Sequence, residues 1–291
     1  MDISLIICTR DRCQKLVRHL ESLRRMTFEG RWEIVIVDNG SIDDTAAVVN
    51  EFIRTAPAPV SFVFEPKPGK SNALNTALQI AAGEIVVFTD DDCYPAEDFL
   101  RQTWSAFSDP SVGYITGRIM LHDPEDAPET INESTTPLTF PGRHYLYPGT
   151  VMGANMAFRQ QVLRDVGGFD PLFGPGAPFY STEDLDVGSR ASAKGWIGQY
   201  HPEVMVRHHH ERKAGDLASM AKCYSIGTGA YYMKLLLRGH EFRWFARGVY
   251  QFGGRATRWY GGTRFWQTIF WETAGAAKYL YYFAGGVRSA P

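Results

Sequence analysis

The sequence lacks several features that would assign it to common classes of protein. Its four cysteines show neither a pairing pattern nor metal-binding spacing, which is typical of a chain kept in a reducing compartment. The net charge is only −2, so nucleic acid is not an expected partner. Neither a Gly-x-Gly-x-x-Gly nor a Walker A pattern is present, which argues against a glycine-rich first turn that cradles phosphates.

Long uninterrupted hydrophobic runs are also missing. The N-terminus opens as a strand and lacks the basic and apolar regions of a secretory signal, so we expect a cytoplasmic protein. The longest apolar stretch, residues 265–286, contains Glu272 and Lys278 and does not meet the requirement for a spanning helix. With 291 residues, 44% of them hydrophobic, the chain can form one large α/β domain, with or without an appendage.

Apolar strands alternate with helical patterns through the first ninety residues. We expect strands at residues 3–8, 33–37, 60–64 and 84–89, and helices at 13–25, from about 43 and from about 70. This order predicts βαβ units and a mainly parallel sheet with right-handed crossovers. Ligands of such sheets bind beyond the carboxyl ends of the strands, where Asp11, Asp38 and Asp90 all lie. The sequence therefore predicts a ligand site at this edge.

The strand at residues 84–89 ends in three carboxylates, Asp90, Asp91 and Asp92. Like charges repel, so such an ending is unusual for a buried strand. In an extended chain Asp90 and Asp92 would share a face and Asp91 would oppose them. Two carboxylates on one face could hold a hard divalent cation whose shell is completed by ligand phosphates. The alternative is an acidic turn before a helix that begins near Pro95.

Three further polar residues near the same edge suit a nucleotide. Asp38 could accept a hydrogen bond from a base N–H, and Asp11 could do similar work; the alternative for both is an Asx-turn or a helix N-cap. Lys70, at the start of a predicted helix, could neutralise phosphates together with a metal. A solvated lysine would occupy the same position equally well.

Two clusters in the second half also carry alternatives. His208 and His210 lie on one face of a predicted strand end and could supply a metal ligand, although single histidines are usually structural. Thr182 could cap a helix from Glu183, and acids in its first turn would then explain Glu183 and Asp186 without a catalytic role. Between these halves, the proline-rich residues 122–148 predict a long lid or binding loop.

The composition changes near Gly215. Residues 215–291 carry ten Lys/Arg against three Asp/Glu, and 18 of the 39 aromatic residues. One apolar stripe has helical spacing: Leu217, Met220, Ala221, Tyr224, Tyr231 and Leu235. Beyond it, six arginines are interleaved with aromatic rings: Arg238, Arg243, Arg247, Arg255, Arg258 and Arg264, with Trp244, Phe245, Tyr250, Trp259, Phe265 and Trp266.

This pattern predicts peripheral contact with an anionic membrane surface, on its cytoplasmic face and without spanning it. The alternative is that the aromatics pack the helices onto the rest of the protein while the arginines extend outward.

The order and spacing of motifs over residues 3–210 resemble those of the family 2 glycosyltransferases of the GT-A fold. The motifs are Thr9-Arg10-Asp11, 37–41, 69–75, Asp90–Asp92, 153–159, 167–170, Thr182-Glu183-Asp184 with Arg190 and Gly195, and His208. The resemblance implies a Rossmann-like α/β sheet between helices in residues 1–214. Its nucleotide-sugar half would cover about 1–118 and its acceptor half about 119–214. Residues 215–291 would then form a helical C-terminal appendage.

The resemblance also implies a reaction. The donor would be a nucleotide-diphosphate sugar, either a UDP-sugar or a GDP-sugar. The cofactor would be Mn²⁺ or Mg²⁺, and the transfer would invert the configuration at the anomeric carbon. The acceptor would be a saccharide or a lipid-linked molecule, in surface polysaccharide or glycolipid assembly. The Gln-x-x-Arg-Trp signature of processive synthases is missing, because Gln251 and Arg255 do not have its spacing. The membrane spans of those synthases are missing as well. These absences favour the addition of a single sugar.

Site roles follow from the resemblance by position. Donor binding is assigned to Thr9, Arg10, Asp11, Asp38 (base), Lys70, Asp90 (ribose) and Asp91. Metal binding is assigned to Asp92 and His208, general-base catalysis to Asp184, and acceptor binding to Asn155 and Glu183.

Two other interpretations have sequence features against them. An inactive homologue that only holds nucleotide sugar would not need Asp92 and Asp184, which are both present. A sugar-phosphate nucleotidyltransferase would generally carry a glycine-rich loop after its first strand, and residues 9–12 contain no glycine.

Overall fold

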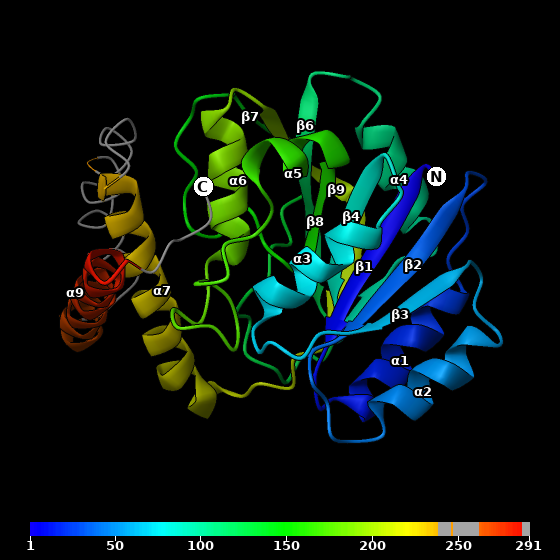
Figure 1. Cartoon of the computed structure of the whole chain (residues 1–291), viewed down its shortest axis with the longest axis horizontal. Coiled ribbons are helices and arrows are strands. Elements are labelled where there is room, and N and C mark those ends of the chain that lie inside the picture. Colours follow the sequence, from blue (N-terminus) through cyan, green and yellow to red (C-terminus); the bar gives the residue numbers. More distant parts are fainter. Residues whose placement is uncertain (238–245, 247–261, 287–291) are drawn as a thin grey trace.

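The computed structural model describes residues 1–237, 246 and 262–286 (Figure 1). Within them, nine strands form one mixed sheet in the order β3-β2-β1-β4-β8-β6-β9-β5, and β7 pairs with β9. The strands are β1 (Ile3–Thr9), β2 (Trp32–Asp38), β3 (Val60–Phe64), β4 (Ile85–Asp90), β5 (Cys93–Pro95), β6 (Val112–Leu121), β7 (Leu138–Phe140), β8 (Asn155–Arg159) and β9 (Ile197–His208). The helices are α1 (Cys13–Arg24), α2 (Thr45–Ile53), α3 (Lys70–Ile80), α4 (Phe99–Ala106), α5 (Gln160–Val166), α6 (Glu183–Ala193), η1 (Ala214–Asp216), α7 (Leu217–Leu237) and α9 (Gly262–Ala284).

The first four strands form the predicted parallel half of the sheet. β1 lies between β2 and β4, and β2 continues to β3, all in parallel. The residues of β1, β2 and β4 are apolar almost without interruption, as expected for strands covered on both faces. In the register, Thr9 pairs with Asp38 and Cys8 pairs with Asp90, so the carboxyl ends of β1, β2 and β4 meet at one edge. The predicted convergence of polar residues at that edge is confirmed.

The second half of the sheet is mixed. β8 runs antiparallel to both β4 and β6, while β6 and β9 are parallel and β5 and β7 pair antiparallel with β9. The long strand β9 ends at His208, opposite Cys93 of β5. This pairing brings the segment after β9 beside the segment after β4. The two are about 120 residues apart in the chain, so only the sheet topology joins them.

Helices cover both faces of the sheet (Figure 1). One hydrophobic cluster joins α1, α2 and α4 to the strand residues that face them, among them Leu16, Phe52 and Phe99. The other cluster joins α3, α5 and α6 to the opposite face, with Phe88 and Phe158 packed edge to face at its centre. Each face therefore has its own continuous core.

The C-terminal helices α7 and α9 lie side by side at the end of the molecule occupied by α6 (Figure 1). Residues such as Ala230, Tyr231 and Tyr279 are buried in the same cluster as α3, α5 and α6. The two helices approach closely at glycines: a Cβ on Gly229 would lie 1.9 Å from the carbonyl oxygen of Glu272. The predicted helical segment is thus present, and packing onto the sheet domain accounts for the inner face of α7.

Two details differ from the sequence predictions. Pro95 does not begin a helix: it ends the short strand β5, and α4 begins at Phe99. The three aspartates are therefore not the first turn of a helix, which removes the helix-start explanation for them. Among the described residues, no helix is long and apolar enough to cross a membrane.

Candidate active site

A cavity of about 990 Å³ opens at the carboxyl edge of the parallel strands. One wall comes from the ends of β1 and β4 and the start of α3. The opposite wall comes from the N-terminus of α6, the loop at residues 128–132, and helices α7 and α9. Of the residues predicted to form the site, the cavity is lined by Thr9, Arg10, Lys70, Asp90, Asp91, Asp92, Glu183, Asp184 and His208.

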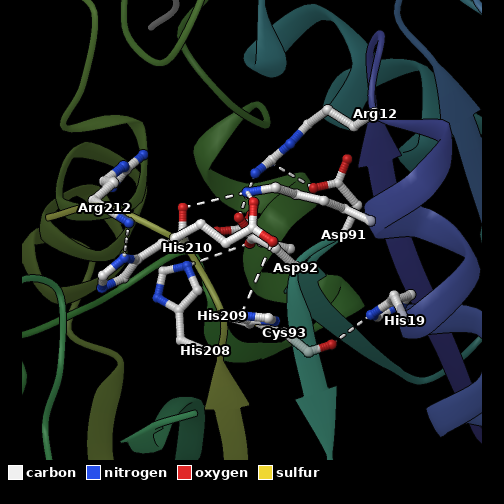
Figure 2. Close-up of polar contacts among 12 residues, drawn as sticks. Arg12, His19, Asp91, Asp92, Cys93, His208, His209, His210 and Arg212 are labelled. Atoms are coloured by element: carbon white, nitrogen blue, oxygen red, sulfur yellow. Dashed lines mark hydrogen bonds and ion pairs between the residues drawn. The ribbon is translucent and has the colours of Figure 1, made fainter. Parts of the chain in front are cut away.

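The three aspartates at the end of β4 have different partners. Asp90 accepts a hydrogen bond from Lys70 Nζ at 2.5 Å. Asp91 is buried and accepts from Thr9 Oγ1 at 2.7 Å and from Arg12 Nη1 at 2.6 Å. Asp92 Oδ2 accepts from the other terminal nitrogen of Arg12, so one guanidinium joins Asp91 and Asp92 (Figure 2).

The predicted shared face of Asp90 and Asp92 is confirmed, because atoms of both lie within 4.8 Å of one another, but the predicted opposite direction of Asp91 is wrong. Strand β4 ends at Asp90, and Asp91 and Asp92 lie in a turn, so the two-residue period of an extended chain does not continue. Asp91 is consequently not directed away from Asp92, because both contact Arg12. Arg12 was not assigned a role from the sequence, although it lies in the short segment that connects Thr9 of β1 to α1.

Four side chains could approach a metal ion together. Atoms of Asp90, Asp92, Cys93 and His208 all lie within 4.8 Å of one another. Burial raises the pKa of the Cys93 thiol well above its ordinary value, and a soft sulfur ligand suits Mn²⁺ or Mg²⁺ poorly. Two carboxylates and an imidazole remain, a set of oxygen and nitrogen ligands that fits Mn²⁺ or Mg²⁺.

Asp92 and His208 face each other within this cluster. Asp92 Oδ1 lies 3.3 Å from His208 Nε2 (Figure 2). Burial alone would raise the pKa of Asp92, but His208 and the Arg12 guanidinium together lower it well below its usual range. Asp92 is therefore ionised at neutral pH. His210 lies on the same side as His208, with ring centroids 5.1 Å apart, which confirms the predicted shared face.

Lys70 is held over the aspartates by a network of loop contacts. Asn39 donates to the carbonyls of Glu65 and Lys67 and accepts from the backbone of Gly69, the residue before α3. From this position Lys70 Nζ also lies 3.7 Å from Glu183. Its contact with both carboxylates keeps Lys70 charged, because they outweigh the burial that would lower its pKa. Lys70 is thus not the solvated lysine of the alternative interpretation.

The N-terminus of α6 carries two acids toward the cavity. Asp184 Oδ2 accepts from the backbone N–H of Gly153 at 2.7 Å, and its Oδ1 accepts from the N–H of Leu185. Burial raises the pKa of Asp184. Burial and the neighbouring Asp184 raise the pKa of Glu183 to about 7. Thr182 makes no capping hydrogen bond, so the predicted side-chain cap of this helix is wrong.

Asp186 is removed from the cavity. It is buried between Arg190, whose Nη2 lies 2.8 Å away, and Lys234 of α7 at 2.6 Å. Its carboxylate is used in the ion pairs that attach α7 to α6. Of the three acids in the first turn of α6, only Glu183 and Asp184 are placed for chemistry.

Three other predicted residues do not line the cavity. Asn155 is buried, and its amide donates to the carbonyls of Arg118 and Val204. The prediction that Asn155 contacts the acceptor is therefore wrong, because this amide joins strands instead. Asp38 accepts from the N–H of Ser41, a local contact of the kind that the alternative predicted, whereas Asp11 accepts from the N–H of Ile42 and so joins two loops that are far apart in the sequence. A role in binding the base stays a prediction for these two.

The cavity wall formed by α7 and α9 was not predicted as part of the site. It includes Met220, Tyr224 and Trp271, and Lys222 Nζ lies 4.3 Å above the Trp271 ring. The apolar stripe of α7 was visible in the sequence, but the surface that it would meet was not. Its first half faces the cavity, whereas Tyr231 and Leu235 are buried in the core.

Comparisons with known proteins indicate a family and a fold. The model of the glycosyl transferase family 2 matches residues 4–167. The curated glycosyltransferase AglE of Haloferax volcanii is 23% identical over 249 residues, which cover 85% of this chain and 79% of AglE. The chain spans about half the length of other curated relatives, 55% and 44% in two cases.

Solved structures show the same fold. A mannosyltransferase from Pyrobaculum calidifontis, in complex with GDP-Man and Mn²⁺, matches with a TM-score of 0.65 and 22% identity, over 96% of this chain and 87% of the other. Residues 1–349 of TarS from S. aureus, in complex with UDP-GlcNAc, match with a TM-score of 0.63 and 18% identity, over 86% of this chain and 72% of that one.

Proposed function

The chain belongs to the glycosyl transferase family 2, and from this premise we propose that it is an inverting, metal-dependent glycosyltransferase that moves one sugar from a nucleotide-diphosphate sugar to an acceptor hydroxyl. One observation carries the proposal. Lys70 lies between Asp90 of the metal cluster and Glu183 beside Asp184, so the donor-binding and proton-accepting groups face one cavity.

Asp184 is the general base of the proposed reaction. In an inverting transfer the acceptor oxygen attacks the anomeric carbon, the bond from that carbon to the leaving diphosphate breaks, and a carboxylate takes the acceptor proton. Asp184 lines the cavity, and the N–H groups of Gly153 and Leu185 fix the orientation of its carboxylate. Glu183 is more deeply buried and closer to Lys70, which suits it to hold the acceptor or the sugar.

The metal cluster would serve the leaving group. Asp90, Asp92 and His208 would hold Mn²⁺ or Mg²⁺, and the bound cation would stabilise negative charge on the departing diphosphate. Lys70 adds a fixed positive charge on the same side of the cavity. A UDP- or GDP-sugar remains the expected donor, since the related structures contain GDP-Man and UDP-GlcNAc.

A thermal-shift experiment would test donor and metal together. A ligand that binds only the folded protein raises its melting temperature, by an amount that depends on concentration and affinity. UDP- and GDP-sugars should raise the melting temperature more with Mn²⁺ than with EDTA. Hydrolysis of the stabilising donor would then distinguish an enzyme from an inactive nucleotide-sugar-binding homologue. No shift with any nucleotide sugar would contradict the proposal.

We also propose that the protein meets the cytoplasmic face of a membrane, where a lipid-linked or saccharide acceptor of polysaccharide or glycolipid assembly would be presented. The outer face of α9 supports this proposal through exposed apolar side chains: Trp266, Phe270, Leu280, Tyr281 and Phe283. Most of the predicted basic and aromatic residues lie outside the described residues: Arg238, Arg243, Arg247, Arg255 and Arg258, with Trp244, Phe245, Tyr250 and Trp259.

A further inference from the structure

We propose that Arg12 and Thr130 are positioning residues of the metal site. Arg12 holds the orientation of Asp92, and Thr130 holds that of His208. This inference rests on the metal site of the proposed function. Both residues lie in loops that are far from β4 and β9 in the sequence, and neither was assigned a role from the sequence.

The first half of the arrangement concerns Asp92. Its two carboxylate oxygens have different partners: Oδ2 accepts from the Arg12 guanidinium, and Oδ1 faces His208 Nε2 at 3.3 Å (Figure 2). Arg12 is itself fixed, since its other terminal nitrogen donates to the buried Asp91 at 2.6 Å. Thr9 Oγ1 holds Asp91 from the other side. The forked guanidinium therefore leaves Oδ1 directed at the ligand cluster.

The second half concerns His208. Its Nδ1 lies 3.4 Å from Thr130 Oγ1, and this hydroxyl donates its proton to the carbonyl of Glu129 at 2.6 Å. A hydroxyl whose proton is used in this way can only accept from the imidazole, so Nδ1 carries a hydrogen and Nε2 is the nitrogen left to bind a metal ion. Thr130 has a left-handed backbone, with φ of 57°, in the loop that lines the cavity.

Together these contacts direct the two ligand atoms, Asp92 Oδ1 and His208 Nε2, at each other. A cation between them would be held by both. Partners that hold the far side of a metal ligand typically contribute about 10- to 100-fold to metal affinity. Arg12 could instead act only as a positive charge near the site, in which case its removal would strengthen the binding of a divalent cation.

Measurement of Mn²⁺ affinity by electron paramagnetic resonance separates these possibilities. The full chain would be titrated in the presence of UDP and, separately, GDP. Arg12→Met and Arg12→Lys are both expected to weaken Mn²⁺ binding by about 10- to 100-fold, because a lysine keeps the charge but cannot bridge Asp91 and Asp92. Arg18→Met is the matched control: Arg18 lies on α1 and pairs with the exposed Glu211, so affinity should not change.

Thr130 has its own pair of variants. Thr130→Val should weaken Mn²⁺ binding by about tenfold, and Thr130→Ser, which keeps the hydroxyl, should restore it. The ¹⁴N coupling of an imidazole to bound Mn²⁺ should be present in the wild type and diminished in Thr130→Val.

Four outcomes would overturn the proposal in whole or in part. Equal or stronger Mn²⁺ binding in Arg12→Met would show that Arg12 acts only as a positive charge near the site. Unchanged ¹⁴N coupling in Thr130→Val would show that Thr130 does not position His208. If Asp92→Asn binds Mn²⁺ as well as the wild type does, the metal site itself fails, and both this inference and the metal part of the proposed function fail with it. Loss of binding in Asp92→Asn with normal binding in Arg12→Met overturns the positioning role alone.

Discussion

Lys234 Nζ lies 2.6 Å from Asp186 Oδ1, which joins the C-terminal helix α7 to α6, the helix that carries Asp184. The same ammonium lies 2.6 Å from Asp170, and Arg190 completes the buried set of two cations and two carboxylates. Ser189 and Tyr231 add a hydroxyl contact of 2.6 Å between the same helices. The helix that forms one wall of the cavity is therefore attached directly to the helix that presents the proposed base.

Lys234→Met should destabilise the protein strongly. The substitution leaves the buried Asp170 and Asp186 without their shared cation, and removal of one partner from a buried ion pair typically costs about 3–5 kcal/mol. The free energy of unfolding, measured by denaturant titration, should fall by this amount. Lys194→Met, at an exposed lysine just after α6, is the control and should change it by less than about 0.5 kcal/mol. An unchanged free energy in Lys234→Met would show that the ion pairs contribute no net stability.

This attachment also shows where the sequence was informative and where it was not. The parallel half of the sheet could be predicted because apolar strands alternate with helices, and parallel strands necessarily align their carboxyl ends. The position of Asp90 at that edge follows from the same argument. Lys234 gave no comparable signal, because it stands in an apolar helical pattern and acquires its role only when α7 meets α6.

The metal cluster shows the same limit. The carboxylates after β4 were visible in the sequence, but the contribution of Arg12 depends on a turn at Asp91 and Asp92 that no local pattern announces. Asn155 illustrates the opposite error. Its place in a motif suggested contact with the acceptor, whereas the structure uses its amide to satisfy the carbonyls of Arg118 and Val204. A motif position identifies a residue that matters without showing whether it touches the substrate.

Asp92→Asn should abolish metal-dependent donor binding and activity. The amide cannot supply the negative charge that a divalent cation requires, although its size and shape are nearly those of the acid. Donor binding is measured by thermal shift in Mn²⁺ and turnover by product formation. EDTA should reproduce the defect in the wild type, and added Mn²⁺ should reverse it. Full activity of the variant, or of the wild type in EDTA, would refute the metal assignment.

Asp184→Asn should keep the fold and donor binding but lose turnover. Asparagine has nearly the same size and shape, and its single oxygen can accept from the N–H of Gly153 or from that of Leu185, but it cannot take a proton from the acceptor. Loss of a general base typically lowers the rate by about 10²–10⁴-fold. The comparison is Glu183→Gln, which should mainly raise the KM for a substrate. A near-normal kcat in Asp184→Asn, with a large loss in Glu183→Gln, would transfer the role of the base to Glu183.

The pH dependence should reflect the raised pKa values of these two acids. The base must be ionised to act, so kcat/KM should rise with pH as the Glu183–Asp184 pair loses its proton, and fall when pH drops below that range. The pKa of Glu183 is raised to about 7 and that of Asp184 is raised as well. The acid limb of the pH profile should therefore lie well above the pH range in which ordinary carboxylates titrate. Glu183→Gln should move the limb to lower pH, because it removes a neighbouring negative charge. A wild-type limb near pH 4 would contradict this prediction.

The exposed face of α9 should determine binding to membranes. Trp266, Phe270 and Tyr281 are each more than 60% exposed, and they fall near one side of the helix. Insertion of such a ring into an apolar layer contributes about 1.5–3 kcal/mol, or roughly tenfold in affinity or more. The wild type should therefore sediment with anionic vesicles, and the double variant Trp266→Ser, Phe270→Ser should show a sharply reduced bound fraction.

High salt should weaken binding as well, because the arginine-rich sequence between α7 and α9 would lose its attraction to anionic headgroups. Neutral vesicles are the lipid control, and unchanged turnover of the double variant in solution would show that its cavity is intact. If the wild type fails to bind anionic vesicles at low salt, the aromatic face of α9 must serve another contact.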